Sequence, residues 1–122
     1  MKRIVWVRDS KADLKRFPEV VQKHIGVALM VAQMGDKHPD AKPMRGFGGA
    51  SVIEVIEDHD GDTYRAVYTV RFAEALYVLH CFQKKSRRGI ATHRRDIDLI
   101  KERLRRAEEL YRQRIVCGSP GF

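Results

Sequence analysis

The sequence predicts a small α+β domain, in which helices and an antiparallel sheet occupy separate stretches of the chain. Two helix-like segments come early, between residues 10 and 35. Strand-like segments then follow one another from residue 52 to residue 82, with short turns between them, and an amphipathic helix comes last. Elements that segregate in this way, rather than alternating strand with helix, are typical of α+β domains. The length of 122 residues fits one domain.

The first third of the chain is predicted to form a strand and two helices. Residues 3–8 are expected to be the strand. Ser10 suits the N-cap of a short helix that runs to about Phe17. Pro18 suits the first position of a second helix, where its missing N–H costs nothing, and Gly35 is expected to end that helix. The apolar residues that recur at helical spacing in the second helix are Val21, Ile25, Ala28, Leu29 and Ala32.

The middle of the chain is predicted to be a linker followed by a three-strand antiparallel meander. Residues 35–50 are rich in Gly and Pro and are expected to form the linker. Residues 52–56 and 63–72 are expected strands joined by the Asp60-Gly61 turn, a strong hairpin signal. Residues 75–82 form a nearly continuous apolar run, expected to be a central strand buried on both faces. Alternation places on one face of the second strand Tyr64, Ala66, Tyr68, Val70 and Phe72.

A C-terminal helix is predicted to begin near Thr92, which suits its N-cap. The apolar stripe of this helix consists of Ile97, Ile100, Leu104, Ala107 and Tyr111. The domain is expected to span residues 1–113, with residues 114–122 as a flexible tail.

The chain is basic, and its positive charge is concentrated. It has 24 Lys and Arg against 16 Asp and Glu, a formal net charge of +8. Six of the basic residues fall within residues 84–95, where no acidic residue interrupts them. Solvated surfaces usually mix both signs, so this run favours a platform for a polyanion such as nucleic acid. The simpler alternative is a basic protein whose charge serves only its solubility.

Cysteine usage and the N-terminus bear on the compartment. Cys81 and Cys117 do not form a disulfide framework, so a reducing cytoplasm is expected. Residues 1–8 hold only four apolar residues between basic ends, too few for a signal peptide or a transmembrane helix. No histidine or cysteine cluster has zinc-site spacing, so neither a metal nor another cofactor is expected.

Glu54, Arg65 and the pair Lys84 and Lys85 are the candidates for catalysis, because neighbouring strands bring their side chains together on one face. RNA cleavage by transesterification needs a base for the 2′-hydroxyl, cations for the pentacovalent phosphate and a proton for the leaving 5′-oxygen. Arg65 suits the phosphate because a guanidinium binds phosphate oxygens in a bidentate way. A lysine crowded by other cations, or Glu54, is a candidate for the base.

Each of these residues also has a purely structural interpretation. Glu54 and Arg65 can form a simple cross-strand ion pair, and Lys84 and Lys85 can be solvated charges at the end of a strand. His80 lies in an apolar strand and is expected to be a hydrogen-bonded core histidine.

Several segments of the sequence resemble a known family. The two most specific are Tyr64-Arg65-Ala66-Val67-Tyr68 and Val78-Leu79-His80-Cys81-Phe82-Gln83-Lys84-Lys85. Residues 42–46, residues 52–55 and Ile97-Asp98-Leu99 match the family's linker, second strand and last helix. Over about residues 3–112 the chain resembles the phage-derived branch of the RelE/HigB-like toxins, which belong to type II toxin–antitoxin modules.

The resemblance implies a compact sheet flanked by helices and an enzyme that cleaves mRNA, usually in the ribosomal A site. It also implies inhibition by a cognate antitoxin, often a small helix-turn-helix protein encoded next to the toxin. By motif match, the active-site positions would be Glu54, Arg65, Lys84 and Lys85. The basic residues expected to bind the RNA backbone are Lys42, Arg45, Arg71, Arg87 and Arg88.

Two other functions remain open from the sequence. ParE-like toxins share the fold and inhibit DNA gyrase instead, so the fold alone does not settle the target. A non-catalytic nucleic-acid-binding module would show salt-sensitive binding without strand scission.

Overall fold

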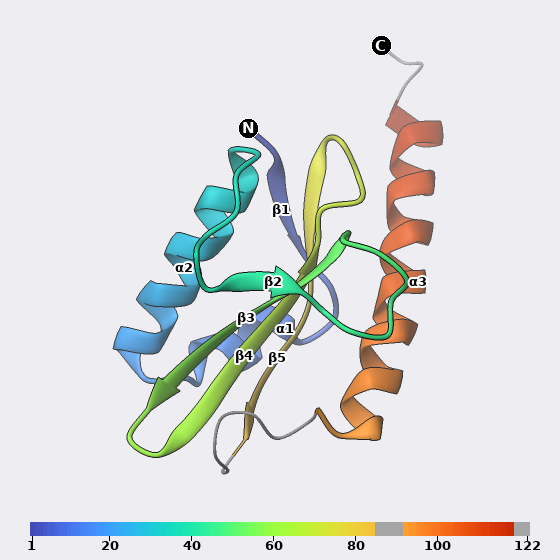
Figure 1. Ribbon diagram of the computed structural model, residues 1–122. Coiled ribbons are helices and arrows are strands. Elements are labelled where there is room, and N and C mark those ends of the chain that lie inside the picture. Colours follow the sequence, from blue (N-terminus) through green and yellow to red (C-terminus); the bar gives the residue numbers. More distant parts are fainter. Residues whose placement is uncertain (85–91, 119–122) are drawn as a thin grey trace.

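The computed structural model describes residues 1–84 and 92–118, with side chains of the last helix described as far as residue 114. It confirms an α+β fold that begins with a strand and ends with a helix (Figure 1). The elements are β1 (Arg3–Trp6), α1 (Ser10–Lys15), α2 (Glu19–Gln33), β2 (Ala41–Pro43), β3 (Val52–His59), β4 (Asp62–Thr69), β5 (Ala75–Lys84) and α3 (Arg94–Gly118).

A five-stranded sheet forms the centre of the molecule, in the order β1-β5-β4-β3-β2. The meander β3-β4-β5 is antiparallel, as predicted, and β1 adds to β5 in parallel. The continuous apolar run of β5 explains its place inside the sheet, because both of its faces are covered. The edges are the short strands β1 and β2, which limits exposed strand edge.

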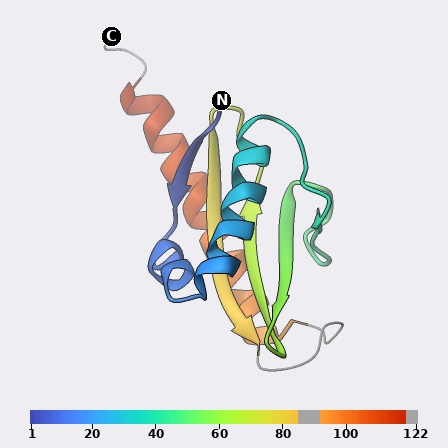
Figure 2. The same ribbon diagram turned by 90° about the vertical axis from the view of Figure 1, so that its left-hand side faces the viewer.

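Helices cover both faces of the sheet. The helices α1 and α2 lie on one side and α3 on the other (Figures 1 and 2). The core on the α2 side includes Ile25, Val55 and Tyr68, and the core on the α3 side includes Tyr77 and Ile100. Since residues of a strand alternate between faces, Val55 and Glu54 point to opposite sides of β3.

The hairpin between β3 and β4 has the predicted Asp-Gly turn. Asp60 and Gly61 have φ angles of 51° and 85°. Positive φ at both central residues is the type I′ turn, whose twist matches that of the two strands. The end of α2 is also as predicted, because Gly35, at φ 89°, closes the helix through its N–H to the Ala32 carbonyl.

Three predicted helix starts are wrong in detail. Ser10 is not an N-cap: its hydroxyl donates instead to the Val78 carbonyl of β5, at 3.1 Å, and Asp9 precedes the helix without a side-chain cap. This follows from the packing of α1 on β5, which buries Ser10 beside that carbonyl. Pro18 is the cap residue of α2 rather than its first helical residue. Thr92 is not a cap either, since α3 begins at Arg94.

Three further expectations need correction or extension. The linker 35–50 contains the strand β2. Phe72 packs on the α3 side rather than with Tyr68, because β4 ends at Thr69 and the chain turns. The helix α3 runs to Gly118 and so includes part of the segment expected as a tail. The extent of the domain stays a prediction.

Candidate functional site

Charged side chains line the face of the sheet that α3 covers. Lys42 of β2 is directly opposite Glu54 of β3, and the same row continues through β4 to His80 of β5. Arg65 lies in the next row, opposite Phe82, and Lys84 in the row after it. Residues two apart on a strand share a face, so all of these side chains project towards the α3 side.

Arg65 lies at the centre of this group, on β4. Its Nη1 is 3.9 Å from Glu54 Oε1 and donates a hydrogen bond of 3.0 Å to Thr92 Oγ1, just ahead of α3. The side chains of Arg65 and Glu54 are only 5% and 10% exposed. Removing either charge would break a buried ion pair, so changes at the two residues are expected to be coupled.

Lys84, at the end of β5, is also buried, at 5% exposure. Burial lowers the pKa of Lys84 and the positive charge of Arg65 lowers it further, whereas Asp96 and Glu54 act in the opposite direction. The net effect places this pKa below the ordinary value for lysine. An ammonium group that gives up its proton more readily is better suited to proton transfer.

His80 is held between two residues of α3. Its Nε2 lies 3.0 Å from Asp96 Oδ1, and its Nδ1 lies 3.4 Å from Arg103 Nη1. Because a guanidinium only donates, Nδ1 accepts, and the neutral ring donates from Nε2 to Asp96. Burial lowers the pKa of His80, and the positive charge of Arg103 lowers it further. The hydrogen bond to Asp96 raises this pKa but does not offset the two effects. The prediction of a hydrogen-bonded core histidine is confirmed.

Sequence reasoning missed Thr92, Asp96 and Arg103 as members of this group. A signal existed for the last two: Asp96 and Arg103 fall on the same helical face as Ile100 and Ala107, the buried stripe of α3. Arg103 is 8% exposed and donates from Nη1 to the Leu79 carbonyl at 3.0 Å. A charged residue within a buried stripe indicates a specific partner.

The other predicted positions that the structure describes are exposed rather than buried with this group. Lys42 and Arg45 are exposed, on β2 and just after it. Arg71 pairs with Glu108 of α3, its Nη1 3.3 Å from Glu108 Oε1. The other three predicted residues, Lys85, Arg87 and Arg88, lie outside the described residues. The structure thus brings Glu54, Arg65 and Lys84 to one face, and the catalytic roles assigned to them stay predictions.

A family model described as "Phage derived protein Gp49-like (DUF891)" matches residues 12–105, most of the chain. The chain belongs to this Gp49-like family. The family is one of RelE-like toxins and is associated with toxin–antitoxin modules. No curated protein matches the chain. In the part of the chain that the structure describes, no helix is both long and apolar enough to cross a membrane.

Proposed function

We propose that this Gp49-like protein is the toxin of a type II toxin–antitoxin module and acts as a metal-independent endoribonuclease on mRNA at the ribosome. Family membership supports the toxin role. The observation that carries the enzymatic part is Lys84, a lysine with a lowered pKa beside Arg65 and Glu54 on one sheet face. Such a group can bind a phosphate and move protons without a metal.

The proposed reaction is an attack of the 2′-oxygen on the adjacent phosphorus. A base takes the 2′-hydroxyl proton, the 2′-oxygen–phosphorus bond forms, the phosphorus–5′-oxygen bond breaks and a proton reaches the leaving 5′-oxygen. The products are a 2′,3′-cyclic phosphate and a 5′-hydroxyl. Arg65 and Lys84 bind the phosphate and stabilise its growing negative charge, and Lys84, which gives up its proton more readily than an ordinary lysine, can protonate the leaving 5′-oxygen. Glu54 or Lys85 serves as the base.

Access to this group imposes a condition on the mechanism. Glu54, Arg65 and Lys84 are each less than a tenth exposed. The Thr92 hydroxyl accepts the Arg65 hydrogen bond that a phosphate oxygen would accept in a substrate complex. A phosphate oxygen that accepts this Nη1 proton has to displace the Thr92 hydroxyl, which acts as a stand-in acceptor in the free protein.

Exposed basic residues next to the group are suited to the RNA backbone. Lys42 lies in the same row as Glu54 and is solvent-exposed, and Arg45 follows it. We propose that both contact phosphates, as does Arg71 after it releases Glu108. Arg87 and Arg88 are proposed for the same role from the sequence.

The burial of Glu54, Arg65 and Lys84 favours a second candidate function, in which these side chains only stabilise the fold. The protein would then inhibit a target such as DNA gyrase by binding, as ParE-like toxins do. The deciding experiment incubates purified protein with ribosomes translating a defined mRNA and maps new 5′ ends, with a gyrase supercoiling assay alongside. Cleaved mRNA with unaffected gyrase supports the endoribonuclease. Inhibited gyrase with intact mRNA contradicts it.

A further inference from the structure

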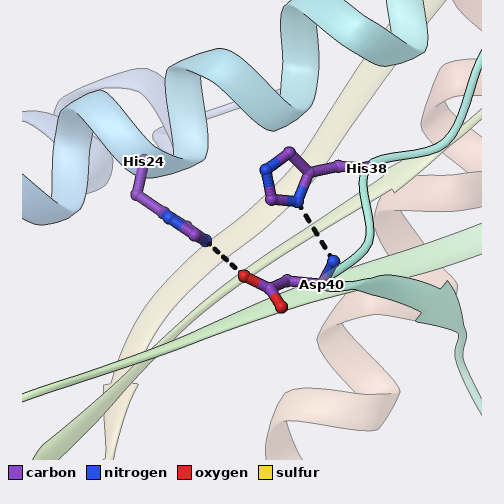
Figure 3. A group of neighbouring side chains, drawn as sticks. All are labelled: His24, His38 and Asp40. Atoms are coloured by element: carbon purple, nitrogen blue, oxygen red, sulfur yellow. Dashed lines mark hydrogen bonds and ion pairs between the residues drawn. The ribbon is translucent and has the colours of Figure 1, made fainter.

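A second cluster of ligand-type side chains lies on the α2 side of the sheet. It consists of His24 of α2 with His38 and Asp40, which precede β2 (Figure 3). One possible ligand atom from each residue lies within 4.8 Å of the other two. Arg65 and Glu54 project from the opposite face, so this cluster is separate from the candidate active site.

His24 has a carboxylate at each of its ring nitrogens. Its Nε2 is 3.0 Å from Asp40 Oδ2 and its Nδ1 is 3.6 Å from Glu57 Oε2. A neutral imidazole has a single N–H, so it can donate to only one of them. At the other nitrogen, a lone pair then faces a negative oxygen. A cation between that nitrogen and the carboxylate would relieve this contact.

His38 presents a nitrogen that is already in the form a metal needs. Its Nδ1 accepts the Asp40 backbone N–H at 3.1 Å, so the neutral ring carries its proton on Nε2 and a lone pair on Nδ1. The His24 and His38 rings approach edge to face, with centroids 5.1 Å apart. Coordination through Nδ1 would replace one hydrogen bond and leave the tautomer unchanged.

We propose that His24, His38 and Asp40 bind a divalent transition-metal ion, with zinc as the best fit. Two imidazoles and a carboxylate are typical zinc ligands, and water can complete a tetrahedral site. Glu57 then acts on His24 as a carboxylate that fixes the ring and leaves Nε2 for the metal. The His24 and Asp40 side chains are 23% and 45% exposed, which leaves an entry path.

Metal binding requires a modest contraction of the cluster. Zinc bonds of about 2.0–2.2 Å place ligand atoms of one tetrahedral site roughly 3.3–3.6 Å apart. His38 and Asp40 belong to the segment between α2 and β2, outside regular structure, so their side chains can move towards His24. The nearby turn adds negative charge that attracts a cation, since four of the 16 acidic residues lie in residues 57–62.

The bound ion would fasten the segment before β2 to α2. It would stabilise the folded state by mass action, since the unfolded chain lacks the preformed cluster. This role is structural and does not depend on the proposed RNA cleavage. It is also compatible with metal-independent catalysis, because the two sites occupy opposite faces of the sheet.

The test titrates EDTA-treated, full-length protein with Zn²⁺ by calorimetry and with Co²⁺ by absorption spectroscopy. We expect one ion per chain, a raised unfolding temperature and a tetrahedral cobalt spectrum without a thiolate band. His24→Gln and Asp40→Asn should each weaken binding by at least about tenfold, since changing even a residue that only orients a ligand costs about 10–100-fold. Asp40→Asn keeps the proposal testable if His24→Gln does not fold, because Asp40 is exposed.

His59→Gln is the matched control. It removes another histidine whose Nε2 faces a carboxylate, 3.3 Å from Asp60 Oδ2, without touching the three ligands. It should bind zinc as the unmodified protein does. Equal weakening by His59→Gln, unchanged binding in both ligand variants, or no saturable binding at all would overturn the proposal. A doubly protonated His24 that persists in excess zinc would do so as well, because a proton would then fill the position assigned to the metal.

Discussion

Arg65 and Thr92 are joined by a hydrogen bond of 3.0 Å from Nη1 to Oγ1, which links the middle of the sheet to the residue just before α3. The same Nη1 lies 3.9 Å from Glu54 Oε1. Arg65, on β4, therefore connects β3 with the segment just before α3. Any change at Arg65 affects both the proposed chemistry and the packing of α3, and experiments have to separate these effects.

Arg65→Lys should separate them. Lysine keeps a positive charge beside Glu54 but lacks the planar fork that binds two phosphate oxygens. We expect a folded protein whose single-turnover cleavage of ribosome-bound mRNA is slower by about 10²–10³-fold, as for loss of a preorganised donor. Arg106→Lys is the control, because Arg106 lies on the outside of α3, where it pairs with Glu109 within the described residues. A folded Arg65→Lys protein that cleaves at the unmodified rate would remove Arg65 from the active site.

Lys84 predicts a distinct pH dependence of stability. Its pKa is lowered in the folded protein, so the unfolded chain binds this proton more tightly. Between the lowered pKa and the ordinary value of 10.5, the unfolded state carries more protons and the free energy of unfolding rises with pH. Urea unfolding of the protein and of Lys84→Met, from neutral pH up to about pH 10.5, measures the difference. The tyrosines should contribute equally to both proteins, because their raised pKa values come first from burial and not from Lys84. A difference that does not grow with pH would contradict this prediction.

Arg103 should contribute more to the free energy of unfolding than an arginine on the protein surface does. Its guanidinium donates to the Leu79 carbonyl and to His80 Nδ1 from within a buried helix face. In Arg103→Leu both acceptors lose their donor, which we expect to lower the free energy of unfolding by about 1–3 kcal/mol. The pKa of His80 should rise, because the positive charge of Arg103 lowers it. Arg105→Leu, on the exposed side of α3, is the control for both measurements, made by denaturant unfolding and NMR titration.

The parts of the fold that could be predicted are those with local causes. The turn at Asp60-Gly61 follows from its dipeptide, and the alternation of Glu54 and Val55 between faces follows from the geometry of a strand. Glu54, Arg65 and Lys84 could therefore be expected on one face from sequence alone. The three-residue strand β2 could not, because its pairing with β3 has no side-chain pattern of its own within a Gly- and Pro-rich segment.

The parts that could not be predicted depend on how helices dock. Thr92 meets Arg65 only because α3 crosses that face of the sheet, and spacing along the chain does not contain this information. The register of β4 and β5 shifts at a bulge, which leaves Leu79 between the partners of Val67 and Tyr68. The sequence pattern of the two strands does not predict this bulge. His24 and Asp40 meet because the chain turns back from α2 to β2, and spacing along the chain does not predict this contact either.

The exposed basic residues predict a salt-dependent component of RNA binding. Lys42→Gln combined with Arg45→Gln should weaken binding to single-stranded RNA at all sequences alike. Each lost phosphate contact should reduce the slope of log affinity against log salt by about 0.7. Lys23→Gln is the control, since Lys23 is also exposed but lies on α2, paired with Glu19. An unchanged slope in the double variant would place these two residues away from the RNA.

The last prediction concerns the antitoxin. A toxin has to be neutralised in the cell that makes it, and a chain with a net charge of +8 favours a partner that is acidic at the contact. We expect a stable complex with a small protein encoded in the adjacent open reading frame, which we propose to be a helix-turn-helix protein. The contact should bury at least about 1,000 Å², so that the complex survives purification.

Co-expression should restore growth, and co-purification of the two chains should follow. Arg65→Lys should still bind this partner, because its fold is intact, which separates loss of toxicity from loss of binding. If the neighbouring protein does not bind and the chain alone is harmless at high expression, the toxin function fails, and a nucleic-acid-binding module becomes the better explanation of its charge.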